Sequence, residues 1–121
     1  MGLVAHILEN MDAFAESYFA AVLFFGGQES EFDDKNCYDM HLGDLLRQLD
    51  ECNRFQVENA ADIAGWESQA GHDFYLTRCG MGAGFWDGDW PEEAGERLSA
   101  ASRLYGSFDA YVGDDGKIYC T

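Results

Sequence analysis

Basic residues are scarce in this chain. Seven lysines and arginines stand against 23 aspartates and glutamates, which gives a formal net charge of −16 and an isoelectric point near 4.1. Binding to phosphate groups needs clustered Lys and Arg, so this balance excludes direct nucleic-acid binding and attachment to anionic membranes. The partners that it favours are the cationic groove of another protein, or cations themselves. High acidity also keeps proteins soluble, and that simpler explanation stays open.

Long apolar runs and paired cysteines are missing as well. The run from Phe19 to Phe25 is far shorter than the ~20 residues of a membrane span. Glu9 and Asp12 interrupt the only stretch that resembles an export signal, so we expect a cytoplasmic protein. The four cysteines are Cys37, Cys52, Cys79 and Cys120. They form no Cys-x-x-Cys pair, and we expect them to be free thiols in a reducing compartment.

No catalytic, cofactor or metal motif is present. The histidines and cysteines lack the close spacing of zinc ligands. The glycine-rich segment 80–84 leads into a predicted strand and has no lysine, unlike a phosphate-binding loop. His72 and Cys79 form a nucleophilic pair only if they meet in space, and Arg78 alone is nearby to lower the thiol pKa. We therefore predict no enzyme, no cofactor and no metal, with a His72–Cys79 enzyme as an alternative.

The first seventy residues have the apolar periodicity of helices. Residues 3–25 place apolar side chains on one face, and Asn10 followed by Asp12 is positioned to cap a second helix that ends at a Gly-Gly pair. Segment 26–39 is predicted to be a solvated acidic loop, because it lacks the calcium-loop pattern. Another helix is predicted from an N-cap at Asp39 towards Trp66. Its apolar stripe is Leu42, Leu45, Leu46, Leu49, Cys52 and Phe55.

Residues 71–121 alternate in the manner of strands around one helix. Two aromatic runs flank the glycines within 71–87 and predict a β-hairpin. Pro91, followed by two glutamates, begins a helix that Gly106 ends. The apolar stripe of this helix is Ala94, Leu98, Ala101, Leu104 and Tyr105. Asp114-Asp115-Gly116-Lys117 is typical of a two-residue turn in a second hairpin. The predicted fold is one α+β domain over 1–121, with long helices over 1–70 packed on a small antiparallel sheet of ββαββ order.

Three segments of the second half resemble a known family. GHDFYLTRCGMGAGFWDGDW, GERLSAASRLYG and FDAYVGDDGKIY together resemble a family of small bacteriophage-encoded proteins without an assigned function. The resemblance covers the C-terminal half well and the first seventy residues only loosely. It implies an origin in a phage or prophage and a bacterial cytoplasm as the working place. It carries over no catalytic residues.

The functional prediction depends on the carboxylates. B-DNA carries one charge per ~1.7 Å of axis, and a protein with dense surface carboxylates presents a similar field. Such a protein attracts and blocks the cationic groove of a DNA-binding enzyme. We predict a non-enzymatic phage protein that binds a basic protein of the bacterial host as a DNA mimic, in the manner of an anti-CRISPR or anti-restriction inhibitor.

The residues predicted to bind this partner lie in the acidic loop, on the outer face of the following helix and around the Asp-Gly-Asp-Trp segment. They are Glu29, Glu31, Asp33, Asp34, Asp44, Asp50, Glu51, Glu58, Asp62, Trp86 and Trp90. The two tryptophans are included because aromatic side chains beside carboxylates suit a protein interface. An alternative is an accessory or structural phage protein that forms a homodimer through exposed aromatics.

Overall fold

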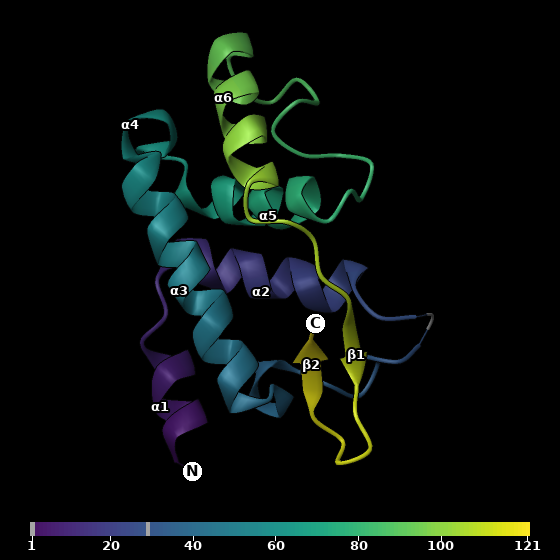
Figure 1. The fold of residues 1–121 in the computed structure, drawn as a ribbon. Coiled ribbons are helices and arrows are strands. Elements are labelled where there is room, and N and C mark those ends of the chain that lie inside the picture. The colour runs from purple at the N-terminus through teal and green to yellow at the C-terminus, as the bar shows by residue number, and fades with distance from the viewer. Residues whose placement is uncertain (1, 29) are drawn as a thin grey trace.

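The computed structural model describes residues 2–28 and 30–121. This part of the chain is mostly helical and ends in a small antiparallel sheet (Figure 1). The elements, in chain order, are α1 (Leu3–Glu9), α2 (Ala13–Phe25), the 3₁₀-helix η1 (Cys37–Asp39), α3 (Leu42–Glu58), α4 (Ala60–Ile63), α5 (Glu67–Arg78), α6 (Glu92–Arg103), β1 (Ala110–Val112) and β2 (Ile118–Cys120).

The helix boundaries of the first half follow local capping chemistry. Asp12 separates α1 from α2, as predicted, and its carboxylate accepts a hydrogen bond from the backbone N–H of Ala15 at 2.9 Å. The third long helix begins later than expected. His41 is the N-cap of α3, whereas Asp39 closes a capping box with Asn36 around η1. The predicted N-cap at Asp39 is therefore wrong by two residues.

The hairpin predicted over 71–87 is wrong. Residues 67–78 form α5, and residues 79–91 form an irregular loop that leads to α6. Nearly all of α5 from Ala70 to Arg78 is buried, so the helix has no polar face to produce a 3.6-residue period. Aromatic and glycine residues that indicate a hairpin in isolation here belong to a helix enclosed by its neighbours. The ββαββ order is thus replaced by a helical array.

Gly71 shows how closely α5 is enclosed. A Cβ atom at this position would lie 2.0 Å from the backbone carbonyl oxygen of Phe14 in α2. The two helices therefore touch through their backbones, and they lie side by side at the centre of the molecule (Figure 1). Aromatic rings fill the space around this contact. Phe74 of α5 stacks on Phe55 of α3 with ring centroids 4.2 Å apart.

Arg78 joins four parts of the fold beneath this core. Its guanidinium donates hydrogen bonds to Glu51 of α3 at 2.7 Å and to the hydroxyl of Tyr18 in α2 at 3.1 Å. It also donates to the backbone oxygens of Tyr105 and Gly106, at 2.9 and 2.7 Å, where the chain leaves α6. The Arg78 side chain is buried, so these partners replace the water that a cation requires.

The second predicted hairpin is confirmed, but its two-residue turn is wrong, because residues 113–117 lie between the two strands. β1 and β2 pair antiparallel, with Tyr111 opposite Tyr119. The Asp115 carboxylate accepts hydrogen bonds from the backbone N–H of Lys117 at 3.0 Å and from the Tyr119 hydroxyl at 2.7 Å, which holds the turn. Within the described residues this pair is the whole sheet, and it is attached to η1 by a bridge between Met40 and Ile118.

Three further expectations concern the burial of the apolar stripes, the pairing of the cysteines and the presence of a membrane-spanning helix. Leu46 and Leu104 were expected in apolar stripes, yet Leu104 is 88% exposed and Leu46 is also exposed, while polar Gln48 and Ser102 are buried instead. The four cysteines are unpaired, as predicted. Among the helices of the described ranges, none combines the length and apolarity that crossing a membrane requires.

Candidate functional site

The acidic loop and the C-terminal hairpin form one edge of the molecule. Glu31 accepts a hydrogen bond from the backbone N–H of Val112 at 2.8 Å, and Lys35 donates one to the carbonyl of Gly116 at 2.9 Å. Each of these bonds joins residues 81 positions apart. The loop after α2 and the two strands accordingly lie together on one side of the ribbon (Figure 1). We name residues 26–36 and 109–119 the acidic edge.

Negative charge predominates on the acidic edge. Its described part contains six carboxylates and only two lysines, Lys35 and Lys117. The carboxylates are Glu31, Asp33, Asp34, Asp109, Asp114 and Asp115. All except half-buried Glu31 are exposed. The edge therefore joins three of the predicted contact residues, Glu31, Asp33 and Asp34, to carboxylates of the hairpin that were not predicted from the sequence.

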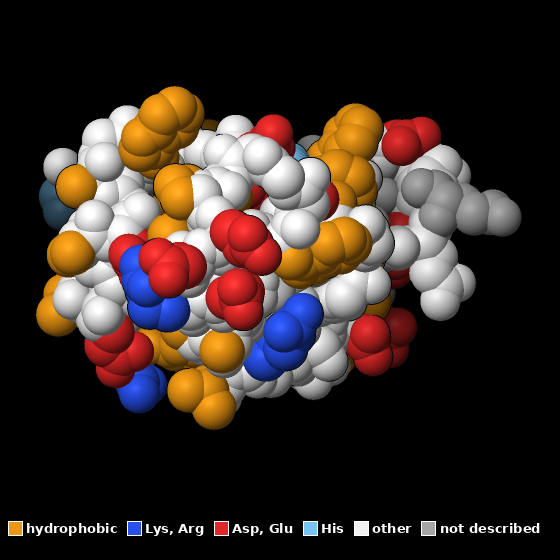
Figure 2. All heavy atoms as spheres, turned by 90° about the horizontal axis from the view of Figure 1, so that it is seen from above, with side chains coloured by type: hydrophobic (Ala, Val, Ile, Leu, Met, Phe, Trp, Pro, Cys, Tyr) orange, Lys and Arg blue, Asp and Glu red, His pale blue; other side chains and the backbone are white. Residues whose placement is uncertain are grey.

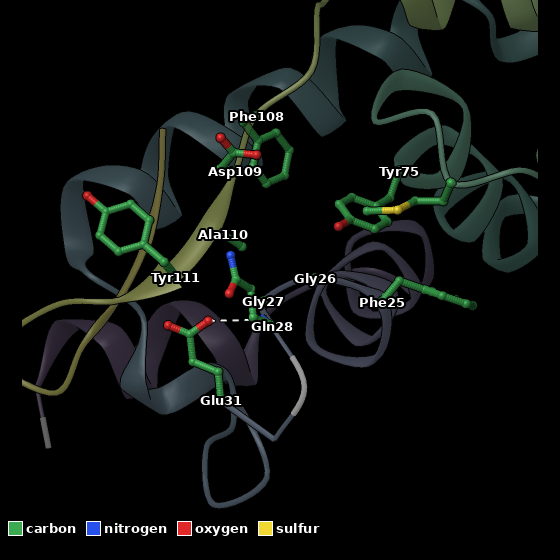
Figure 3. Close-up of a pocket in the computed structure, with 11 residues that line it drawn as sticks. Phe25, Gly26, Gly27, Gln28, Glu31, Tyr75, Phe108, Asp109, Ala110 and Tyr111 are labelled. Atoms are coloured by element: carbon green, nitrogen blue, oxygen red, sulfur yellow. Dashed lines mark hydrogen bonds between the residues drawn. The ribbon is translucent and has the colours of Figure 1, made fainter.

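A pocket of about 520 Å³ opens where the acidic edge meets α2 and α5 (Figure 3). We name it the Tyr75 pocket. Side chains around it that matter for binding are Glu31, Tyr75, Phe108, Asp109 and Tyr111. Its volume lies in the range of small-molecule sites, roughly 300–1,000 Å³.

The hydroxyl of Tyr75 faces this pocket. The residue is 1% exposed, and Figure 3 shows the hydroxyl directed towards the backbone that follows α2. None of the described residues forms a hydrogen bond with it. Gly26 leaves the space in front of it open, because a Cβ there would lie 3.2 Å from the Tyr75 oxygen. Burial raises the pKa of Tyr75 above its ordinary value, so the phenol stays neutral at physiological pH.

Glu31 is held in place beside the pocket. One carboxylate oxygen accepts from the backbone N–H of Gln28 at 3.1 Å, shown as the dashed line in Figure 3, and the other accepts from Val112. Each oxygen keeps further capacity to accept. Asp109 adds a second carboxylate to the wall. The pocket thus combines negative charge, a free phenol and aromatic rings.

The α3 carboxylates are largely used inside the molecule. Asp44, expected on the outer face, is only 6% exposed, so that expectation is wrong. It accepts from the backbone N–H of Cys120 at 3.0 Å and pairs with Arg47 at 2.8 Å. Glu51 binds the buried Arg78. Both carboxylates fasten distant parts of the chain, and only the tertiary contacts reveal this.

The other predicted carboxylates have mixed roles. Glu58 accepts from the Tyr105 hydroxyl at 2.8 Å. Asp62 forms two hydrogen bonds with Arg97, at 2.8 and 2.9 Å, and these bonds lower the pKa of Asp62. Asp50 remains exposed, 4.0 Å from Arg54. Glu29 lies outside the described residues.

Carboxylates do not gather into one stripe on the face seen in Figure 2. There, acidic side chains stand apart, separated by basic and hydrophobic ones. This face is seen from above α6, away from the hairpin (Figure 1). A continuous DNA-like row is therefore not a feature of this face, and the candidate site is the acidic edge.

The two predicted tryptophans differ from one another. Trp86 is 53% exposed in the loop before α6, which is compatible with an interface. Trp90 is 9% exposed, and its indole N–H donates to the buried Asp73 at 2.7 Å. Trp90 therefore holds the loop against α5, and the expectation that it is available to a partner is wrong.

The sulfur and imidazole groups do not form an activated pair. Cys79 donates a weak hydrogen bond to the carbonyl of Phe108 at 3.8 Å, and burial raises its pKa, which disfavours the thiolate. His72 lies 3.2 Å from Asp73 instead. Within residues 2–28 and 30–121, no three His, Cys, Asp or Glu side chains are grouped to hold a metal ion.

Comparisons with known proteins do not place this chain in a family. No protein-family model, no curated protein and no solved structure matches this sequence. A phage origin accordingly stays a prediction from the C-terminal segments. The features that bear on function are the acidic edge and the Tyr75 pocket.

Proposed function

We propose that this protein is a non-enzymatic phage inhibitor that binds a basic, nucleic-acid-binding protein of its bacterial host through the acidic edge. The observation that carries the proposal is the juxtaposition of two acidic segments 81 positions apart, with only two lysines among them. Nucleic-acid-binding grooves present clustered Lys and Arg, and an opposing negative surface attracts them at long range.

The contact residues of the proposal follow from exposure. Asp33 and Asp34 are kept from the predicted set, and Asp109, Asp114 and Asp115 join them. Asp44 and Glu51 are removed, since they are committed to internal partners. The ring of Tyr111, which is partly exposed and stacks on that of Tyr119 with centroids 5.8 Å apart, provides a flat surface. Arginine side chains stack well on such rings.

The test compares two variants with equal loss of charge. D33N/D34N/D114N neutralises the acidic edge, and E92Q/E93Q/E96Q neutralises exposed carboxylates of α6 as a matched control. Wild-type protein is immobilised, bacterial lysate is passed over it, and the captured proteins are assayed for DNA binding and nuclease activity with and without added protein.

We expect a captured protein that binds DNA and loses that binding when wild-type protein is added. The edge variant weakens this inhibition about tenfold or more, whereas the α6 variant changes it about twofold at most. The affinity also falls between roughly 50 and 500 mM salt. A captured nuclease that keeps full activity, or binding insensitive to salt, would contradict the proposal.

A homodimeric accessory protein is the second candidate. The observation in its favour is exposed apolar surface at Phe24, Val57 and Leu104, each of which is at least 79% exposed. These residues belong to three separate segments, α2, α3 and the end of α6. Light scattering separates the candidates, because the inhibitor needs no self-association.

A further inference from the structure

The geometry of the Tyr75 pocket points to a ligand that the acidic edge alone does not specify. We infer that the pocket binds the cationic end of an organic molecule, an alkylammonium or a guanidinium group. This inference concerns the pocket itself and does not require the macromolecular partner proposed above.

The hydroxyl of Tyr75 is the first feature that favours such a ligand. Among the described residues, the fully buried side-chain polar atom without a partner is Ser99 Oγ, so the Tyr75 oxygen is not sealed off and water in the pocket reaches it. Tyr75 is 1% exposed, its hydroxyl faces the pocket, and none of the described residues pairs with it (Figure 3). A ligand N–H group in the pocket would donate to this oxygen. The residue needs no hydroxyl for packing alone, because phenylalanine fills the same space.

The walls of the pocket are negatively charged. Glu31 and Asp109 both line the pocket, and the lining residues include no Lys or Arg. An anionic ligand would meet two carboxylates with nothing to balance them. A metal ion is also disfavoured, since the described residues group no three suitable ligands. The charge of the pocket is complementary to a cation.

The aromatic lining of the pocket favours an organic cation. Cations are attracted to the faces of aromatic rings. Phe108 already has the guanidinium of Arg78 at 5.2 Å from its ring centroid, so it is partly engaged. The Tyr75 ring is buried, whereas Tyr111 carries no such neighbour among the described residues and is partly exposed, so the ring of Tyr111 is the one available to the ligand. Its position beside Glu31 and Asp109 suits a flat guanidinium or a compact ammonium group.

The ligand has two possible sources with the same chemistry, a free small cation or an arginine or lysine side chain of a protein. We therefore choose two probes with uncharged partners of the same shape. Butylguanidinium is compared with butylurea, and the peptide acetyl-Gly-Arg-Gly-amide is compared with its citrulline counterpart. Binding to the full chain is followed by two-dimensional NMR.

We expect butylguanidinium to bind with a dissociation constant of about 1 mM, a reasonable value for so few atoms. The shifted resonances include those of Tyr75, Gly26 and Tyr111, and butylurea produces no saturable shift. Saturable binding of the arginine peptide alone would support the pocket and assign its ligand to a protein side chain. Equal binding of the charged and uncharged probes would overturn the inference.

Variants of the pocket test the individual contacts. Y75F removes only the unpaired hydroxyl and weakens binding about tenfold. D109N also weakens it about threefold to tenfold. E93Q removes the same charge from the exposed face of α6, away from the pocket and the acidic edge, and changes binding about twofold at most at physiological salt.

Folding and function are kept separate in this experiment. Thermal melts of Y75F that match those of the wild type show that the hydroxyl has no structural role, and wild-type affinity in that folded variant would refute the inference. Binding of butylguanidinium without inhibition of any DNA-binding protein would retain the pocket and remove the proposed function. Inhibition of a DNA-binding protein without binding of butylguanidinium would retain the proposed function and refute the inference about the pocket.

Discussion

Replacing Gly71 by alanine tests the central contact of the fold. The added Cβ would lie 2.0 Å from the carbonyl oxygen of Phe14 and 3.1 Å from its Cα, and both are backbone atoms that no rotamer change can move. Ordinary contacts of this kind begin near 3.4 Å. α2 and α5 must therefore separate along a contact that is otherwise closely packed.

The expected change in the free energy of unfolding of G71A is the balance of two effects. Overpacking of a core costs about 3 kcal/mol when the backbone must move. Alanine in place of glycine in a helix stabilises the folded protein by about 1 kcal/mol, because alanine has the higher helix propensity. The net loss is therefore about 2 kcal/mol in the free energy of unfolding, which lowers the melting temperature by roughly 8 °C for a domain of this size. This is a large part of the ~5–15 kcal/mol that stabilises a small domain.

The assay is thermal and urea unfolding followed by circular dichroism. G43A serves as the control, because Gly43 is exposed in α3 and its added Cβ would meet only the His41 side chain. We expect G43A to be as stable as the wild type or slightly more stable. If G71A melts within about 2 °C of the wild type, then residues 67–78 do not pack against α2 as described and the account of the core is wrong.

Two further predictions concern charged contacts. Arg78→Met leaves the Glu51 carboxylate, the Tyr18 hydroxyl and two backbone oxygens without their donor, so the free energy of unfolding should fall by about 3 kcal/mol; a loss below about 1 kcal/mol in urea unfolding would show that the network is not structural. Asp62→Asn is expected to change how the stability of the protein depends on pH. Hydrogen bonds from Arg97 lower the folded pKa of Asp62 below its ordinary value of 3.8, so the stabilisation is present above that pH and is lost as the pH falls through the folded pKa. Melting temperatures from neutral to acidic pH should therefore fall less in D62N than in the wild type, and identical profiles would count against the contribution of this pair.

Local chemistry explains which predictions from the sequence are confirmed. Asp12 caps α2 through a neighbour three positions away, and the Asp-Gly turn of the final hairpin is held by bonds spanning two and four positions. The start of α6 after Pro91 is of the same kind. Such signals depend on a few consecutive residues, so they survive without knowledge of the fold.

Burial on every side explains the main error. α5 is enclosed by α2, α3 and the α6 region, and its buried residues include Asp73, Thr77 and Arg78 as well as aromatics. Periodicity detects a helix by the contrast between a wet face and a dry face, and this helix has no such contrast. Gly71, which resembles a boundary in the sequence, is instead the point of closest approach to α2.

The candidate site, too, is predictable from the sequence only in part. The net charge of −16, the free thiols and the acidic character of the loop after α2 follow from composition and spacing alone. Which carboxylates face a partner does not, because Asp44 accepts a hydrogen bond from the backbone of Cys120, 76 positions away, and Glu51 pairs with Arg78, 27 positions away. The Tyr75 pocket also depends on long-range packing, since α5, the acidic loop and β1 meet only in the folded chain. Interactions within a few residues can be predicted from the sequence, whereas burial and pairing between distant parts of the chain arise only when the helices pack.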